Sequence, residues 1–338
     1  MATTDGLLLG IDIGGTKTAV IAGRAHAEGL QVLARRAFPT EPSTRSWRQT
    51  LDTVREESRR LLSDARLEGR PVAAGVSCGG PLDSAAGLLL SPPNLPGWDQ
   101  VPVVADLQGA LGCPVFLQND ANACALAEWR YGAGAGTRNM VFLTFGTGMG
   151  GGLILGGRLY EGTNDLGGEV GHIRLAEDGP EGYGKRGSFE GFSSGGGIAN
   201  YARERARAQL GAGRRVSFCQ STVDLDSITA RSVGEAAEAG DELALEILSV
   251  SGKWLGRGLS ILIDILNPQR IVIGGIFVRC RAFLHASMEA EIARETLPGA
   301  AAVCEIVPAR LGESIGDYAA LSVAVDGLAR GAPVKGTT

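Results

Sequence analysis

The sequence predicts an α/β protein of two structurally related domains with a cleft between them, and three observations support this. The chain has 338 residues, enough for two substantial cores. Hydrophobic residues make up 44% and charged residues 20%, as in ordinary globular proteins. Residues 7–22 and 139–155 follow the same order of strand, glycine-rich turn and returning strand. This repetition indicates an internal structural duplication.

In the first half, apolar runs and turn residues define the elements. Residues 7–22 predict a hairpin, and residues 31–37 a third strand. Apolar residues at near-helical spacing predict a helix that contains Trp47, Leu51, Val54, Leu61 and Leu62. Strands are expected at residues 72–77 and 114–118, the first ending in a sharp loop and the second leading into a helix at 121–131.

The second half predicts a strand at 139–145, a glycine turn at 146–152 and a return at 153–155. The other expected elements are helices at 195–210, 232–266 and 318–329 and strands at 270–275 and 304–307, with loop or tail at 211–222 and 331–338. We expect an N-terminal domain of residues 1–118, completed by a C-terminal helix within 312–330, and a larger domain of residues 119–311.

Composition excludes several classes of protein. The net charge of −5 argues against broad binding to nucleic acid or an anionic membrane. The first ten residues lack the cationic region of a signal peptide, and no apolar stretch reaches membrane-spanning length. The six cysteines are scattered without a CxxC pair, so we expect reduced thiols in a cytoplasmic protein.

The first glycine turn lies in Asp12-Ile-Gly-Gly-Thr-Lys17. Glycines let backbone N–H groups approach phosphate oxygens, so Gly14 and Gly15 are candidate phosphate-binding residues. Asp12 is a candidate Mg²⁺ ligand, directly or through water, and Thr16 and Lys17 can add a hydroxyl and a charge. An ordinary hairpin turn explains the segment about as well. A P-loop is excluded because Thr16 stands where lysine is required.

The second turn, Gly146-Thr-Gly-Met-Gly-Gly-Gly152, contains five glycines besides Thr147 and Met149. Its GxGxxG spacing is that of a dinucleotide-binding fingerprint, but a strand follows where that fingerprint requires a helix. Ordering five glycines costs much conformational entropy, and a bend without a ligand would gain nothing that offsets this cost. We therefore predict a cradle for the β- and γ-phosphates, with Gly146, Thr147, Gly148 and Gly150 as its binding residues.

Asn119-Asp120-Ala-Asn122, between a strand and a helix, is the best candidate for a reacting centre. Asp120 can serve as a helix N-cap, or as a general base that accepts a hydroxyl proton during phosphoryl transfer. Asn119 would orient the same acceptor. Further candidate ligands for vicinal hydroxyls are Asn94, Glu169, His172 and Glu190. Taken alone, His172 and Trp98, which follows Asn94 by four residues, are better explained as structural residues.

These segments together resemble the ROK family (repressor, open reading frame, kinase). The resemblance runs from residue 7 to about residue 329 and rests on the two glycine turns and the segments Asn94-Leu-Pro-Gly-Trp98, Asn119-Asp-Ala-Asn122 and Glu169-Val-Gly-His172. It implies the two-domain, ribonuclease-H-like fold of actin and hexokinase, a homodimer, and ATP- and Mg²⁺-dependent phosphorylation of a hexose. It also implies catalysis by Asp120, sugar binding by Asn94, Asn119, Glu169, His172 and Glu190, and an adenosine-side turn at Gly274 and Gly275.

Three departures from the family pattern matter. The family's zinc cysteines are replaced by Glu181, Tyr183 and Ser188, so we predict no structural zinc. Packing around Tyr183 and Phe189 would then have to position His172 and Glu190. Ile276 replaces a glycine of the adenosine loop, and residues 316–320 match the family only loosely, which leaves the nucleotide preference open.

Four hypotheses about the activity are weighed at this point. The default is a glucokinase, and an N-acylhexosamine kinase or fructokinase is the alternative within the class. A sugar-sensing regulator of the same family would need a DNA-binding segment before the first strand. Only Met1 to Gly6 precede that strand, and this stretch is too short for such a segment, so we do not expect this activity. A non-catalytic sugar-binding protein is disfavoured because Asp120 and both glycine turns are intact. The expected ligands are thus a small sugar and ATP.

Overall fold

The computed structural model describes residues 6–26, 29–64, 67 and 69–331. The expectations for the first five residues and for the tail at 332–338 lie outside the described residues. Within the described part of the chain, no helix has both the length and the hydropathy needed to cross a membrane.

The first half is built on a five-stranded sheet with the order β3-β2-β1-β4-β7. The strands β1, β2 and β3 are antiparallel, whereas β4 and β7 run parallel to β1. Their bounds are β1 (Leu7–Ile13), β2 (Lys17–His26), β3 (Gly29–Pro39), β4 (Ala73–Cys78) and β7 (Val115–Asn119). Parallel strands place their carboxyl ends at one edge, so Asp12, Cys78 and Asn119 lie at the same edge of this sheet.

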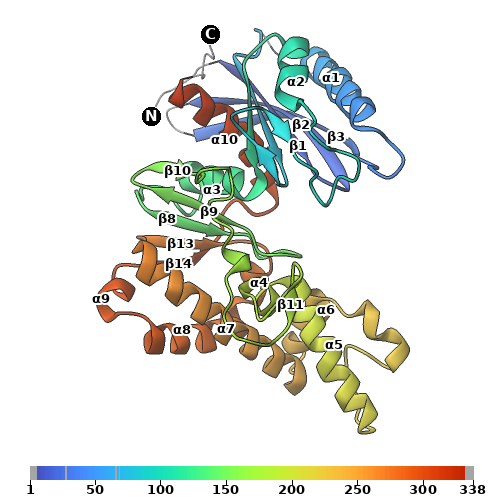
Figure 1. The fold of residues 1–338 in the computed structure, drawn as a ribbon, viewed down its shortest axis with the longest axis vertical. Helices are drawn as coiled ribbons and strands as arrows, with labels where there is room; N and C mark the ends of the chain where they lie inside the picture. The colour runs from blue at the N-terminus through green and yellow to red at the C-terminus, as the bar shows by residue number, and fades with distance from the viewer. Residues whose placement is uncertain (1–5, 27–28, 65–66, 68, 332–338) are drawn as a thin grey trace.

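The second sheet repeats this order with β10-β9-β8-β13-β14. Here β8, β9 and β10 are antiparallel, and β13 and β14 run parallel to β8. The bounds are β8 (Met140–Leu143), β9 (Gly151–Leu155), β10 (Arg158–Tyr160), β13 (Arg270–Ile273) and β14 (Glu305–Pro308). Two sheets with one topology confirm the α/β fold and the duplication that the two glycine-turn segments predict (Figure 1).

Ten helices occur among the described residues, and two of them join the halves. They are α1 (Trp47–Asp64), α2 (Val103–Leu111), α3 (Asp120–Tyr131), α4 (Phe189–Phe192), α5 (Gly195–Gly211), α6 (Ala230–Glu238), α7 (Glu242–Leu266), α8 (Ile276–Glu295), α9 (Pro298–Ala301) and α10 (Ile315–Arg330). Helix α3 contacts α10 and also β8 and β9 of the second sheet. Helix α10 ends the described chain yet packs on the first sheet, beside β1 (Figure 1).

Short elements complete the fold. A hairpin of β5 (Leu82–Asp83) and β6 (Leu88–Leu89) follows β4, and a second hairpin of β11 (Glu181–Gly182) and β12 (Lys185–Arg186) precedes α4. Three 3-10 turns are η1 (Val170–His172), η2 (Thr222–Ser227) and η3 (Gly312–Ser314).

Close backbone contact fixes α10 on the first sheet. A Cβ on Gly75 would lie 2.2 Å from the carbonyl oxygen of Ala320, and one on Gly10 would lie 2.9 Å from the Ala320 Cβ. Glycine at these strand positions therefore lets the helix approach the sheet. Leu321 and Val325 of α10 share a buried cluster with Leu8 of β1 and Ile21 of β2, so the C-terminal helix completes the core of the first half.

The structure corrects two expectations about helices. The segment expected as one helix at 232–266 is two helices, because Gly240 has a φ of +84° and Asp241 caps α7 through the amide of Ala244 at 2.8 Å. Helix α8, absent from the sequence prediction, follows β13 and packs along α7. Its buried side chains include Phe277, Leu284 and Met288.

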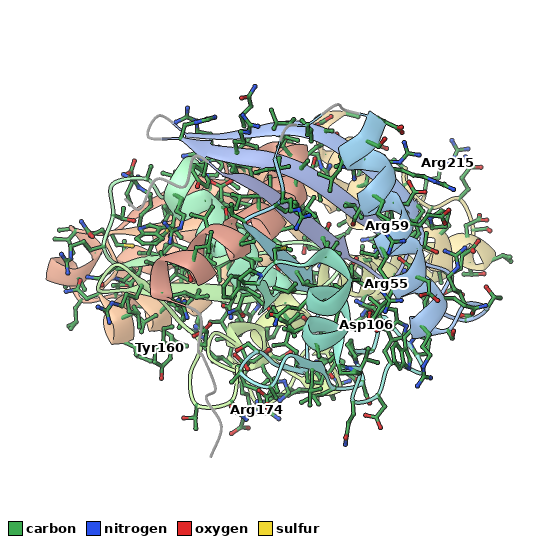
Figure 2. All side chains as sticks on the ribbon, turned by 90° about the horizontal axis from the view of Figure 1, so that it is seen from above. Arg55, Arg59, Asp106, Tyr160, Arg174 and Arg215 are labelled. Atoms are coloured by element: carbon green, nitrogen blue, oxygen red, sulfur yellow. The ribbon has the colours of Figure 1, made fainter. Side chains whose placement is uncertain are left out.

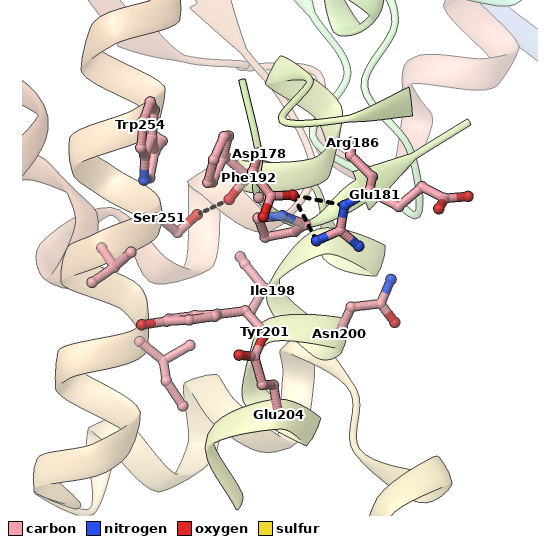
Figure 3. A pocket seen from close by; sticks show the side chains of 14 residues that line it. Asp178, Glu181, Arg186, Phe192, Ile198, Asn200, Tyr201, Glu204, Ser251 and Trp254 are labelled. Atoms are coloured by element: carbon pink, nitrogen blue, oxygen red, sulfur yellow. Dashed lines mark hydrogen bonds and ion pairs between the residues drawn. The ribbon is translucent and has the colours of Figure 1, made fainter. Parts of the chain in front are cut away.

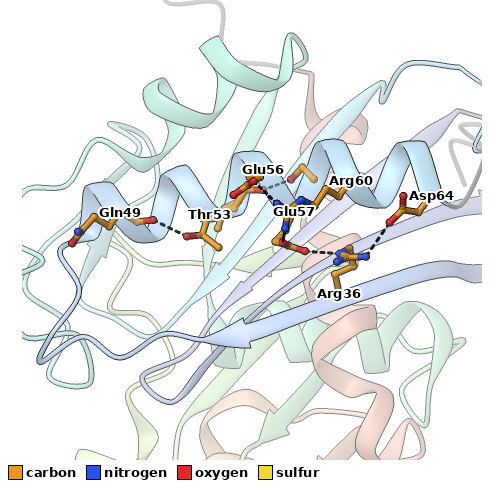
Figure 4. A network of polar contacts seen from close by, with 9 residues as sticks. Arg36, Gln49, Thr53, Glu56, Glu57, Arg60 and Asp64 are labelled. Carbon is orange, nitrogen blue, oxygen red and sulfur yellow. Dashed lines mark hydrogen bonds and ion pairs between the residues drawn. The ribbon is translucent and has the colours of Figure 1, made fainter.

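Ion pairs join the first helix to its neighbours. On α1, Glu57 accepts from Arg36 of β3, and Arg36 also donates to Asp64 at 3.1 Å (Figure 4). Arg55, on the same helix, pairs with Asp106 of α2 (Figure 2). Arg36 and Asp64 are well exposed, so we assign this network a modest effect on stability.

Candidate active site

The first glycine turn is held in place by the neighbouring strand. Gly14 N donates to the carbonyl oxygen of Lys17 at 3.0 Å, which closes the turn between β1 and β2. Thr40, after β3, donates its hydroxyl to the Gly14 carbonyl at 2.7 Å, and its amide donates to the Thr16 carbonyl at 3.0 Å. The side chains of Thr16 and Lys17 are exposed. The turn is thus rigid at its base and open at its tip.

Asp120 is the first residue of α3, and its neighbour Asn119 is the N-cap. The Asn119 Oδ1 accepts from the amide of Ala121 at 2.9 Å, and Asp120 Oδ1 accepts from the same amide at 2.8 Å. The competition expected between a capping and a catalytic role for Asp120 is therefore eased, because Asn119 supplies the cap. The other oxygen, Asp120 Oδ2, lies 3.8 Å from where a Cβ on Gly79 would stand.

Asp12 and Asp120 are close enough to interact electrostatically. Burial, and to a smaller extent the charges of Asp120 and Asp317, together raise the pKa of Asp12 to about 6, against the opposing charges of Lys17 and Arg35. Asp120 is accessible to solvent, but the protein atoms packed around its carboxylate partly desolvate it and raise its pKa, against the effect of the Ala121 amide. The start of α10 lies beside this pair, since a Cβ on Gly316 would be 3.0 Å from Asp12 Oδ2.

The second glycine turn packs on the start of α3. The amide of Thr144 donates to the carbonyl oxygen of Gly150 at 2.9 Å, and the amide of Gly150 donates to the hydroxyl of Thr144 at 2.7 Å. A Cβ on Gly150 would lie 3.1 Å from the Cβ of Ala121. The turn therefore lies next to the residue that follows Asp120. The structure thus brings the second glycine turn and the candidate base together.

Two long helices begin at this turn. The first amides of α5 bind its carbonyl groups, with Gly195 N to Gly146 O at 2.7 Å and Gly196 N to Thr147 O at 2.9 Å. Helix α8 begins after Gly274 and Gly275, where Ile276 N donates to Phe145 O at 2.7 Å. Helix N-termini favour anions, so phosphate groups suit this region.

Ile276, which departs from the family pattern, packs against the start of α5. A Cβ on Gly195 would lie 2.6 Å from Ile276 Cδ1. Gly275 has a φ of +63°, and a Cβ there would lie 2.1 Å from Phe145 O. Glycine is therefore required at 275, whereas position 276 accepts a large side chain that joins the two helix starts.

Glu169, His172 and Glu190 form a polar group beside the same turn. Glu169 is exposed, but partial desolvation by neighbouring protein atoms raises its pKa, and the charges of Asp120 and Glu190 raise it further while His172 lowers it. Glu190 Oε2 accepts from the amide of Met149 at 2.8 Å, so this carboxylate orders the glycine turn. The 3-10 turn η1 fits closely there, because a Cβ on Gly171 would lie 2.2 Å from Met149 O.

Asn94 lies on an exposed loop next to the first glycine turn. A Cβ on Gly15 would lie 2.7 Å from Asn94 O. Leu95 and Trp98 of the loop are buried in the core of the first half. The structure thus gives Trp98 the structural role favoured for a tryptophan judged alone, and it keeps Asn94 at the protein surface.

A short hairpin occupies the segment where the family has its zinc motif. Strands β11 and β12 are joined by Tyr183 and Gly184, both with positive φ. Tyr183 does not pack into the interior, because it is 74% exposed, but its ring lies edge-on to His172 at 6.4 Å. Lys185 Nζ instead binds the His172 carbonyl at 2.7 Å, and Ser188 caps α4 through Gly191 N at 3.1 Å.

Phe189 is fully buried as expected, and a cavity of 530 Å³ lies beside this region, between the hairpin, α5 and α7 (Figure 3). Phe192 stacks on Trp254 at 3.9 Å along its wall. Arg186 pairs with Asp178 at 2.7 Å at its rim. Its lining shares no residue with the group around Asp120.

Sequence reasoning missed several glycines that shape the site. Gly79 and Gly80 follow β4 and face Asp120 and Asn119, since a Cβ on Gly80 would lie 3.1 Å from Asn119 Nδ2. The start of α5, Ser194-Gly195-Gly196-Gly197, was assigned only as a helix. Its run of glycines after a capping serine was the available signal.

Comparisons with known proteins agree with this geometry. The family model described as the ROK family matches residues 8–326. A glucokinase of Streptomyces coelicolor is 33% identical over 80% of this chain and 82% of its own length. An N-acetylmannosamine kinase of Citrobacter koseri is 34% identical over 79% of this chain and 82% of its own length.

Two solved structures share 29% sequence identity with this chain. A ROK hexokinase from Thermus thermophilus has a TM-score of 0.76 and covers 96% of this chain and 100% of its own. A ROK family glucokinase from Streptomyces griseus, in complex with glucose and AMPPNP, has a TM-score of 0.70 and covers 95% and 100%.

Proposed function

The chain belongs to the ROK family, and from this premise we propose that it transfers the γ-phosphoryl group of ATP to glucose, at the 6-hydroxyl. It is an ATP-dependent sugar kinase of the actin-like, two-domain fold. The single observation that carries the finer proposal is the position of Asp120, at the start of α3, beside both Asp12 and the second glycine turn.

Asp120 is proposed as the general base. Its raised pKa makes it a better proton acceptor than an aspartate with the ordinary pKa, and it would take the proton of the sugar hydroxyl as the bond to phosphorus forms. The transition state of phosphoryl transfer is loose, so an aspartate suffices for this late proton transfer. Asn94, Asn119, Glu169, His172 and Glu190 are the proposed sugar ligands.

The nucleotide phosphates are proposed to lie between the two glycine turns. The turn at 146–150 and the starts of α5 and α8 offer backbone dipoles for negative charge. Asp12 fits a cation, because its buried carboxylate is repelled by Asp120 and Asp317. Mg²⁺ held there, directly or through water, would offset charge on the β- and γ-phosphates.

Several further properties remain proposals. The homodimer rests on the resemblance to the family, and the cytoplasmic location rests on the scattered cysteines. The domain division at 1–118 with 312–330 against 119–311 and the absence of structural zinc rest on the sequence pattern. Glu181, Tyr183 and Ser188 stand where zinc thiolates would be needed, and Ser188 is engaged in capping α4. Elemental analysis of the purified protein checks the zinc prediction, and one zinc per chain would contradict it.

The second candidate is an N-acylhexosamine kinase, which the 34% identity to the N-acetylmannosamine kinase favours. An ADP-release assay across glucose, fructose, allose, N-acetylglucosamine and N-acetylmannosamine separates the two. We expect the highest kcat/KM with glucose. A higher kcat/KM with an N-acylated sugar would show that this sugar, rather than glucose, is the substrate. Sugar binding without ADP release would indicate a sugar sensor rather than a kinase.

A further inference from the structure

A glycine-rich loop, residues 161–168, connects the second sheet to the turn that carries Glu169 and His172. The loop follows β10 and closes at its base, where Gly167 N donates to Glu161 O at 2.9 Å. Gly162 and Gly168 have φ values of +76° and +96°. A loop with so many glycines loses much entropy when it is ordered, so its position depends on outside contacts.

The tip of the loop is bound to the other half of the molecule. Ser84 donates its amide to Asp165 Oδ2 at 2.8 Å and its hydroxyl to Asp165 Oδ1 at 2.7 Å. Ser84 lies between β5 and β6, whose Leu82 and Leu89 are buried in the core of the first half. Both oxygens of one carboxylate thus tie the loop to the first sheet's half, and bonds to an ionised acceptor are stronger than neutral ones.

The base of the loop has a second tie to the same half. Glu161 accepts from Gln118 Nε2 at 2.6 Å and from Arg330 Nη1, at the end of α10, at 2.8 Å. Gln118 ends the buried part of β7, and its Oε1 accepts from the amide of Asn119 at 2.8 Å. The base of the loop is therefore bound to β7, the strand that leads directly into Asp120.

We propose that Asp165 is a positioning residue for the sugar site: by binding Ser84 across the two halves, it holds the loop so that Glu169 and His172 face Asp120. The proposal rests on the proposed function, because it takes Glu169 and His172 as sugar ligands. Asp165 itself lies four residues before Glu169 and acts through the loop rather than on the substrate.

The test compares Asp165→Ala and Asp165→Asn in steady-state kinetics with glucose and ATP. Loss of both bonds should raise the KM for glucose about tenfold, the effect of roughly one strong hydrogen bond. The KM for ATP should stay within about twofold, since the phosphate cradle has separate supports. Asn keeps one acceptor oxygen and the shape of the side chain, so it should recover most of the loss.

Two further variants isolate the contact. Ser84→Ala keeps the backbone bond and should raise the KM for glucose less than Asp165→Ala, and the double variant should be no worse than Asp165→Ala alone. Asp224→Ala is the matched control, because Ser221 binds Asp224 at the same 2.7 Å within one exposed segment. Its KM values should match those of the wild type.

A readout that needs no activity separates this proposal from the proposed function. Hydrogen exchange of the amides in 161–168 should accelerate in Asp165→Ala and not in Asp224→Ala. An unchanged KM for glucose, an equal rise for ATP, or unchanged exchange would overturn the positioning role. Lack of turnover by the wild type with any sugar would overturn the proposed function, and the exchange result would then decide alone whether Asp165 holds the loop.

Discussion

At the scale of single residues, the proposed phosphoryl transfer depends on Asp120. Asp120→Asn keeps the size of the side chain and removes the proton acceptor, so kcat should fall by about a hundredfold or more. The Kd for glucose should change by less than about threefold, because the base acts on the transition state. ADP release and isothermal titration measure the two quantities. Near-normal turnover would mean that another group takes the proton.

The raised pKa of Asp12 makes stability depend on pH. The folded state binds this proton more tightly than the unfolded state, so the stabilisation is complete below about pH 4 and is lost as the pH rises to about 6. The shift corresponds to about 3 kcal/mol of unfolding free energy.

Denaturation with urea in EDTA, at a series of pH values, measures this loss. Asp12→Asn should remove the contribution of Asp12 to the pH dependence of the unfolding free energy. The raised pKa values of Asp120 and Glu169 should leave a smaller decrease of this free energy with rising pH. Identical pH dependence in the variant and the wild type would exclude Asp12 as its source. Nucleotide binding with Mg²⁺ should show the opposite trend and tighten above pH 6, since the cation needs the carboxylate.

Residue types selected the segments of the candidate site, but they did not predict the contacts within it. The motif around Asp120 and the two glycine turns were recognisable in combination, although an ordinary hairpin turn explains the first glycine turn about as well. That Asn119 rather than Asp120 caps α3, or that Glu190 orders the glycine turn through Met149, depends on side-chain geometry. Such choices follow from which of several acceptors reaches an amide, and spacing along the chain does not determine this.

At the scale of elements, Glu128 of α3 fixes the crossing of the chain from β14 to α10. Its side chain is fully buried, and it accepts from Arg310 N at 2.9 Å, Leu311 N at 2.8 Å and Ala133 N at 2.7 Å. In Glu128→Gln the amide nitrogen must face one of these N–H groups. We therefore expect a loss of about 2–4 kcal/mol in unfolding free energy.

Urea denaturation measures this loss, with Glu56→Gln as the control. Glu56 is exposed on α1, where it pairs with Arg60, so its replacement should change stability by less than about 0.5 kcal/mol. Equal stability of the Glu128 variant and the wild type would show that the three amides find other acceptors.

Element prediction succeeded where the apolar pattern was regular and failed where it was not. Strands β1, β2 and β8 are nearly continuous apolar runs and helix α1 has apolar residues at helical spacing, so the sequence places them within a few residues. Helix α8 mixes arginines and small residues around its apolar positions, so only its packing on α7 defines its buried face. The break between α6 and α7 was signalled by Gly240 and Asp241, a stop followed by a cap.

At the scale of the whole molecule, the duplication explains why the site lies where it does. Each sheet has a glycine turn after its first strand, and α3 and α10 run between the two sheets. The candidate base lies at the start of α3, and Gly316, in the first turn of α10, lies beside Asp12. Relative motion of the halves would therefore change the distance between sugar and phosphate groups directly.

The two halves are expected to close on each other when a sugar binds. Water near the γ-phosphate would hydrolyse ATP, so the kinase is expected to close only when a sugar fills the site. Small-angle scattering should show a lower radius of gyration with glucose and a non-hydrolysable ATP analogue than for the free protein in the same oligomeric state. Asp120→Asn should still contract, because it retains sugar binding, whereas Asp165→Ala should need more glucose for the same contraction. An unchanged radius at saturating ligands would mean that the halves are already in their catalytic arrangement, and exclusion of water would then have to come from the loop at 161–168 rather than from a movement of the domains.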